Sequence, residues 1–137
     1  MQSNEVIDGV VKEEYDLAGQ IIGLAMKVHR TLGPGFLEGV YHQALLIELN
    51  RAGIPAESEK PLRVLYDGIS VGEFKADIVI EGQLIVEVKA VQSLATAHEV
   101  QLVNYLTATH IDGGLLLNFG SNKLEFRRKF REYKTKA

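Results

Sequence analysis

The chain has 137 residues, of which 46% are hydrophobic and 24% charged, and its formal net charge is −3. These values are typical of one globular domain, which we expect to span residues 1–137. The absence of cysteine excludes disulfides, thiolate nucleophiles and cysteine-ligated zinc. The sequence has no apolar run long enough to cross a bilayer and no signal-like N-terminus, so we expect a cytoplasmic protein with no membrane partner.

Two helices are predicted in the first part of the chain. Residues 1–12 are mainly polar, and we expect them to be loosely held. Apolar residues then recur at helical spacing from Glu13 to Leu32, and Gly33-Pro34-Gly35 ends this helix. The spacing predicts a second helix from Leu37 to near Gly53.

Three strands are predicted next, over Pro55 to Tyr66, Val71 to Ile80 and Gln83 to Val91. The first two are separated by an Asp67-Gly68 turn, which is typical of a β-hairpin. The second and third are rich in β-branched and aliphatic residues, which favours strands buried on both faces. We therefore expect these segments to form the centre of a sheet.

A third helix is predicted from Thr96 to about His110, where Thr96-x-x-Glu99 has the pattern of a capping box. Leu115 to Phe119 is typical of a buried strand, and Leu124 to Phe130 of a last strand or a short helix. The order α-α-β-β-β-α-β predicts an α/β fold with helices packed on a mixed sheet.

Charged residues interrupt two of the apolar strands. Asp77 lies in one of them, and Glu87 and Lys89 in the next. Such residues are rarely buried unless they are paired or bind a metal, because removing a charge from water is costly. Their presence here predicts either a metal site or a buried structural ion-pair network.

The length of the connecting loop decides whether these residues meet. If Glu81-Gly82-Gln83 forms a three-residue loop, Ile78 opposes Val86, and Asp77 falls directly opposite Glu87. The same register places Phe74 opposite Ala90, and Lys89 on the face of Glu87. A two-residue loop would shift the register by one, but the apolar residues match better with the odd-length loop. Two opposed carboxylates repel, and a bound cation would relieve that repulsion.

The residue types suit phosphodiester hydrolysis. Carboxylates bind Mg²⁺ or Mn²⁺, which can activate water, neutralise phosphoryl oxygens and stabilise the leaving group. A lysine beside such a metal can orient or deprotonate the water. We therefore expect Asp77, Glu87 and Lys89 to form a catalytic site. No dinucleotide fingerprint, Walker lysine motif, H-E-x-x-H pattern or nucleophilic serine context offers a competing site.

Polar residues also line up on the helices. Glu38, Tyr41 and His42 share one helical stripe, and His98, Gln101 and Tyr105 share another. We expect them to line a polar pocket, in which Tyr41, His98, Gln101 and Tyr105 would support the site or contact substrate. The alternatives are a core role for Tyr41, structural or surface roles for the histidines, a buried hydrogen-bonded scaffold for Gln101 and Tyr105, and an exposed first-turn acid for Glu38.

Basic residues gather at the C-terminal end. Residues 123–137 contain seven Lys or Arg and two Glu, whereas the remaining residues carry a balance of −8. This basic segment could hold a phosphate backbone, or it could be a solvated and partly frayed end.

Asp77 followed ten residues later by Glu87-x-Lys89 resembles the signature of the PD-(D/E)XK nuclease superfamily. Gly35-Phe36-Leu37-Glu38-Gly39-Val40-Tyr41 spells G-x-x-E-x-x-Y, the label of a family of small bacterial and archaeal proteins within it. The resemblance continues through the segments Gln101–Leu106 and Leu117–Gly120. Ala76 stands where the superfamily commonly has proline. The resemblance implies a restriction-endonuclease-like core of the RecB-like branch.

The resemblance also implies roles for particular residues. Glu38, Asp77 and Glu87, with the Val88 backbone carbonyl, match the ligands of a Mg²⁺ or Mn²⁺ ion, and Lys89 matches the catalytic lysine. Gln101 and Tyr105 match a Q-x-x-x-Y element that supports the active site or the DNA strand.

The function that we predict from the sequence is a divalent-metal-dependent nuclease acting on nucleic acid, with DNA as the expected substrate. A small domain offers little surface for a duplex, so a homodimer or a partner protein is a further expectation. Two alternatives remain at this point: an accessory binding module that keeps the nuclease fold, and a metal-dependent hydrolase of a small phosphorylated compound, which the acidic body would suit.

Overall fold

The computed structural model describes residues 6–7 and 10–131, and their side chains from Leu17 onward. Two short strands, β1 (Val6–Ile7) and β2 (Val10–Val11), pair antiparallel before the first helix. Both predicted helices are present, as α1 (Lys12–Leu32) and α2 (Glu38–Arg51). The first ends where expected, because Gly33 adopts a positive φ of 69° and its N–H bonds the His29 carbonyl.

Five strands form one sheet in the order β3-β4-β5-β6-β7. β5 and β6 run parallel and are joined through α3 (Thr96–Thr109), whereas the other neighbours are antiparallel. The segment predicted as a strand or a short helix is a strand, β7. The bounds of the strands are Ala56–Tyr66 for β3, Ile69–Ile80 for β4, Leu84–Lys89 for β5, Gly113–Asn118 for β6 and Glu125–Phe130 for β7.

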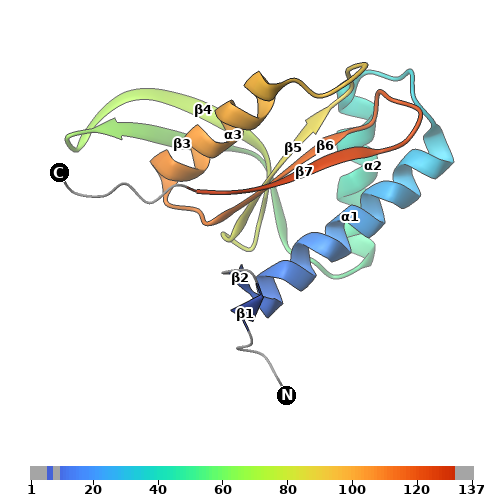
Figure 1. Cartoon of the computed structure of the whole chain (residues 1–137), viewed down its shortest axis with the longest axis horizontal. Coiled ribbons are helices and arrows are strands. Elements are labelled where there is room, and N and C mark those ends of the chain that lie inside the picture. The colour runs from blue at the N-terminus through green and yellow to red at the C-terminus, as the bar shows by residue number, and fades with distance from the viewer. Residues whose placement is uncertain (1–5, 8–9, 132–137) are drawn as a thin grey trace.

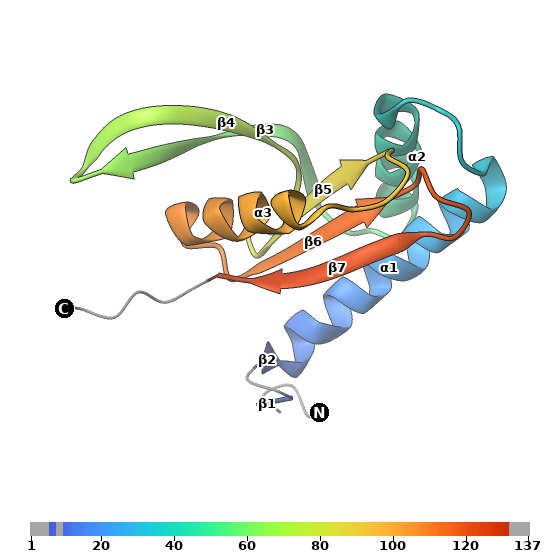
Figure 2. The same cartoon turned by 45° about the horizontal axis from the view of Figure 1, so that its top comes forward.

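Helices cover both faces of the sheet. Figures 1 and 2 show α1 and α2 on one face and α3 on the other. The first interface is built on side chains such as Ile21, Tyr41 and Val86, and the second on Ile85, Leu102 and Leu116. Alternate residues of the central strands therefore enter two different cores, which explains their continuous apolar sequence. The predicted α/β fold, a mixed sheet flanked by helices, is confirmed.

The register between β4 and β5 follows the predicted three-residue loop. Ile78 pairs with Val86 and Ile80 with Leu84, so the matching of apolar residues gave the correct alignment. Backbone pairing ends there, because β4 leaves the sheet with β3 as a two-stranded ribbon beside α3 (Figure 2). The predicted pairing of Phe74 with Ala90 is therefore wrong: Phe74 pairs with Leu62 in β3. Asp77 and Glu87 occupy the point where the two strands part.

Candidate active site

Asp77 and Glu87 bridge the two strands just beyond their last backbone pair. The Asp77 N–H donates to Glu87 Oε2 at 3.0 Å, and the Val88 N–H donates to Asp77 Oδ2 at 2.8 Å. Backbone pairing between the two strands has ended at this point, so these N–H groups lack a carbonyl partner on the neighbouring strand. Each carboxylate accepts a hydrogen bond from such an N–H group of the other strand. Among the described residues, the second oxygen of each carboxylate makes no hydrogen bond. The prediction that these two acids meet is confirmed by the hydrogen bond from the Asp77 N–H to the Glu87 carboxylate.

Burial makes the charge on Glu87 unfavourable. Only 9% of Glu87 is exposed, and desolvation, followed by the negative charge of Asp77, raises its pKa from 4.5 to about 7. The hydrogen bond from the Asp77 N–H and the charge of Lys89 act in the opposite direction, and Glu38 adds a small upward contribution. Glu87 therefore sits in an environment that lacks positive charge.

The donor set fits a divalent cation of the Mg²⁺ type. Such ions prefer oxygen ligands, and two carboxylates that each keep one oxygen without a hydrogen bond supply them. The Val88 carbonyl also points toward Asp77, because the N–H and C=O of one strand residue lie on the same edge and the N–H bonds Asp77. A cation there would offset the repulsion that raises the Glu87 pKa.

Glu38 is the first residue of α2 and is exposed. Its charge acts on Glu87, which places it on the same side of the molecule. Within residues 6–7 and 10–131, however, no three Asp, Glu, His or Cys side chains gather closely enough to hold a metal. The predicted three-carboxylate centre is therefore not assembled in this structure, and a ligand role for Glu38 stays a prediction.

Lys89 is the last residue of β5 and is half-buried. It lies two residues after Glu87, hence on the same face of the strand, and its positive charge lowers the pKa of that acid. Its backbone carbonyl accepts a hydrogen bond from the Phe119 N–H at 2.9 Å. The lysine is thus held by its main chain, and its side chain stays on the face of the acids.

Tyr41 lies in the core, which agrees with the core role that was one of the two alternatives in the sequence analysis. It is fully buried, its ring stacks on Phe119 at 4.7 Å, and its hydroxyl donates to the Gly33 carbonyl at 2.6 Å. The hydroxyl also accepts from the Phe36 N–H at 3.1 Å. Tyr41 therefore fixes the loop that precedes Glu38, which is a supporting role without substrate contact.

Replacing Tyr41 with phenylalanine is expected to lower the free energy of unfolding by about 1–2 kcal/mol, because the Gly33 carbonyl and the Phe36 N–H lose their partner while the stacking remains. Urea denaturation measures this change. The same substitution at Tyr66, which is 69% exposed, is expected to change stability by less than about 0.5 kcal/mol. Equal effects at both positions would contradict the role of the Tyr41 hydroxyl.

His98 acts at the start of α3. Its Nδ1 accepts the Ala95 N–H at 3.0 Å, so its ring is a helix cap. The predicted capping box of Thr96 and Glu99 is wrong, because Thr96 is already the first helical residue. Glu99 instead pairs with Lys129 at 3.1 Å. The His98 side chain therefore orders the beginning of the helix, and its role in supporting the site stays a prediction.

Gln101 and Tyr105 extend the site along α3. The Tyr105 ring stacks on Phe74 with 3.7 Å between ring centroids, which joins the helix to the β3–β4 ribbon. Burial and then the charge of Glu87 raise the pKa of Tyr105, whereas a hydrogen bond with the Gln101 side chain lowers it. Gln101 itself is exposed. Gln101 thus lies on the solvent side, and Tyr105 lies close enough to Glu87 for the charge of that acid to act on it.

The basic C-terminal segment is only partly described. Its residues 123–131 include β7, where Arg127 pairs with Glu99 and Glu125, and Arg131 pairs with Asp112. Much of the positive charge of β7 is therefore neutralised within the protein. Residues 132–137 of this segment lie outside the described part of the chain, so a role in holding a phosphate backbone stays a prediction for them.

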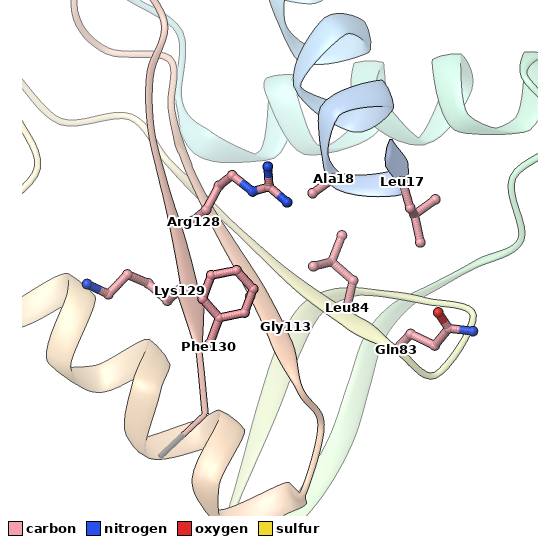
Figure 3. Close-up of a pocket in the computed structure, with 9 residues that line it drawn as sticks. Leu17, Ala18, Gln83, Leu84, Gly113, Arg128, Lys129 and Phe130 are labelled. Atoms are coloured by element: carbon pink, nitrogen blue, oxygen red, sulfur yellow. The ribbon is translucent and has the colours of Figure 1, made fainter. Parts of the chain in front are cut away.

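A small cavity among the described residues is remote from the acids. Figure 3 shows it between the start of α1, the start of β5 and the end of β7, where Leu17, Leu84 and Phe130 line it. Its volume is about 20 Å³, which is enough for roughly one water molecule. Leu84 and Lys89 stand at opposite ends of β5, so this cavity is not the substrate site.

Asn118 was missed as a site residue. It is completely buried at the end of β6, beside Lys89, and its side chain bonds the loop that follows Lys89. The sequence does contain a signal for it, because an amide within the apolar run Leu115–Phe119 must find hydrogen-bond partners when it is buried. The same requirement singled out the acids of β4 and β5. One of its partners, Val91, lies 27 residues away in the sequence, so this contact could not be identified from spacing.

Comparison with known proteins adds a family and a fold. The family model of the PD-(D/E)XK nuclease superfamily matches residues 15–129. Among solved structures, the crystal structure of SSO0001 is similar, with a TM-score of 0.54 and 18% sequence identity. The similarity covers 71% of this chain and 52% of that one, so the chain spans about half the length of that neighbour. No curated protein matches the chain.

Proposed function

Because the chain belongs to the PD-(D/E)XK nuclease superfamily, we propose that it is a divalent-metal-dependent nuclease that hydrolyses phosphodiester bonds in DNA. The observation that supports this most is the placing of Asp77, Glu87 and Lys89 on one face, where β4 and β5 part. The site thus contains two features: a pair of acids whose negative charge is not fully balanced, and a lysine beside this pair. Metal-assisted phosphodiester hydrolysis requires ligands for the ion, and a lysine beside them can assist the attacking water.

In this proposal, Asp77 and Glu87 hold Mg²⁺ or Mn²⁺ together with the Val88 carbonyl, and Glu38 approaches from α2. The ion supplies Lewis-acid stabilisation of the phosphoryl oxygens. Lys89 would orient the attacking water and, when it is in its neutral form, accept a proton from it. Tyr105 and Gln101 contact the substrate strand on α3, because they lead from the solvent-exposed helix surface to Glu87.

The finer assignments of the sequence analysis belong to the same proposal. The match of Gly35–Tyr41 to G-x-x-E-x-x-Y supports membership of that family and of the RecB-like branch. The family match over residues 15–129 supports a single nuclease-like domain. A homodimer or partner protein that adds surface for DNA, and a cytoplasmic location, remain predictions. In the described part of the chain, no helix has the length and apolar character to span a membrane.

A cleavage panel tests this function. Purified protein is incubated with labelled single- and double-stranded DNA and RNA in Mg²⁺, in Mn²⁺ and in EDTA. We expect DNA to be cut only when a divalent ion is present. Binding of metal and DNA without cleavage would indicate the accessory module. Hydrolysis restricted to a small phosphodiester such as bis(p-nitrophenyl) phosphate would indicate the small-molecule hydrolase.

A further inference from the structure

Asn118 ends β6 between two buried apolar residues. Its side chain is completely buried, and its neighbours Leu117 and Phe119 are buried as well. In the sheet it is the direct partner of Lys89 on β5. A buried amide is costly unless its donors and acceptor are satisfied, so its contacts are the reason for its presence.

The amide of Asn118 holds the chain that leaves Lys89. Its Oδ1 accepts the Val91 N–H at 2.9 Å and the Gly120 N–H at 3.0 Å. Its Nδ2 donates to Glu125 Oε1 at 2.8 Å, and the same oxygen accepts the Leu94 N–H at 3.0 Å. Two backbone groups between the catalytic strand and α3 are therefore bound to one Asn–Glu pair.

Gly120 permits this close approach. A Cβ atom built on Gly120 would lie 2.3 Å from the Val91 carbonyl oxygen and 2.5 Å from the Val91 nitrogen. These are backbone atoms, which cannot move aside as a flexible side chain can. In addition, the Phe119 N–H bonds the Lys89 carbonyl at 2.9 Å. Contacts with the end of β6, together with the hydrogen bond from Leu94 to Glu125, thus hold the segment from Lys89 to Leu94 at several successive residues.

We propose that Asn118, through its hydrogen bonds to Val91 and Glu125, is the positioning residue that fixes Lys89 and the start of α3 relative to each other. This inference rests on the proposed nuclease function, because it concerns the alignment of the catalytic lysine with the strand-contacting helix. Lys89 ends its strand, and in the described part of the chain hydrogen bonds to Phe119, Asn118 and Glu125 restrain the segment that follows it. Neither residue makes a hydrogen bond to Asp77 or Glu87 within the described part of the chain, so in this proposal the pair acts through Lys89 and α3.

A charge-exchange experiment tests this role. In Asn118→Asp, a carboxylate oxygen faces the Glu125 carboxylate, and their repulsion separates the pair. We expect kcat for DNA cleavage to fall about 10- to 100-fold, with KM and Mn²⁺ affinity changed less than about threefold. Adding Glu125→Gln returns one donor to the pair and should restore most of kcat. Glu125→Gln alone keeps its acceptor oxygen and should stay near the activity of the unchanged protein.

Two further measurements cover other outcomes. Amide hydrogen exchange at Val91 and Leu94 should accelerate in Asn118→Asp, and exchange at Val91 should slow again in the double variant. If Asn118→Asp fails to fold, Glu125→Ala takes its place, since Glu125 is only partly buried; it should speed Leu94 exchange and lower kcat.

An unchanged kcat in Asn118→Asp, or a double variant that folds but stays as slow as the single, would overturn the inference. The same holds for Glu125→Ala, if it replaces Asn118→Asp and leaves kcat unchanged. If the unchanged protein cuts nothing, the proposed function fails together with the catalytic part of this inference. Amide exchange then decides separately whether the Asn118 contacts order the segment.

Discussion

Replacing Lys89 with alanine is expected to lower kcat for DNA cleavage by roughly 10²- to 10⁴-fold, the range typical of losing a positioned proton-transfer group. Lys89 lies beside Glu87, where it can orient the attacking water and take part in proton transfer. The fold should persist, because the structural contact of Lys89 is its backbone carbonyl, which alanine retains. Single-turnover cleavage assays with Mg²⁺ and Mn²⁺ measure the loss.

The matched control is Lys27→Ala. Lys27 is exposed on α1, on the opposite face of the sheet, and pairs only at the surface with Glu48. Removing such a pair changes stability by less than about 1 kcal/mol and should leave cleavage unchanged. If Lys89→Ala cleaves at the rate of Lys27→Ala, the activity comes from another site or from a contaminating nuclease.

The metal-free protein is expected to lose stability as pH rises from about 4.5 to about 7. The folded state keeps a proton on Glu87 over this range, because its pKa is raised to about 7, whereas the unfolded chain has already released that proton. The free energy of unfolding should therefore fall by about 1.4 kcal/mol per pH unit, or roughly 3 kcal/mol over the whole window. Below the window both states are protonated, and above it both are ionised, so the contribution is constant there.

Urea denaturation in EDTA at several pH values measures this loss. Glu87→Gln imitates the protonated acid and should flatten the curve between pH 5 and pH 8. Glu57→Gln, at an exposed position of β3, should keep the slope of the unchanged protein. Mn²⁺ added at pH 8 should stabilise the unchanged protein but not Glu87→Gln. Identical slopes for both variants would show that Glu87 is not the titrating group.

The register of β4 and β5 could be predicted because it depends on short-range information. The loop Glu81-Gly82-Gln83 and the matching of apolar residues sufficed to place Asp77 opposite Glu87. The end of backbone pairing at these acids could not be predicted in this way. It depends on how the β3–β4 ribbon leaves the sheet and packs beside α3, as the stacking of Phe74 on Tyr105 shows.

The roles of polar side chains were predicted less completely than their positions. His98 lies at the start of α3 as expected, but its partner is its own helix terminus. Asn118 went unnoticed because the contact that ties it to the chain after Lys89 is made with Val91, which lies 27 residues away. Glu38 has the electrostatic effect on Glu87 that proximity implies, but it does not complete a cluster of three ligands. Sequence patterns thus located the polar residues, and tertiary packing decided what each of them bonds.

The central claim is that Asp77 and Glu87 hold a divalent cation, and anomalous diffraction from crystals soaked in Mn²⁺ tests it most directly. The account predicts a peak between the two carboxylates, within bonding distance of an oxygen of each, and its loss in Glu87→Gln. Cleavage of DNA in Mn²⁺ by the same preparation, with no peak at this position or with a peak at another carboxylate pair such as Glu99 and Glu125, would contradict it.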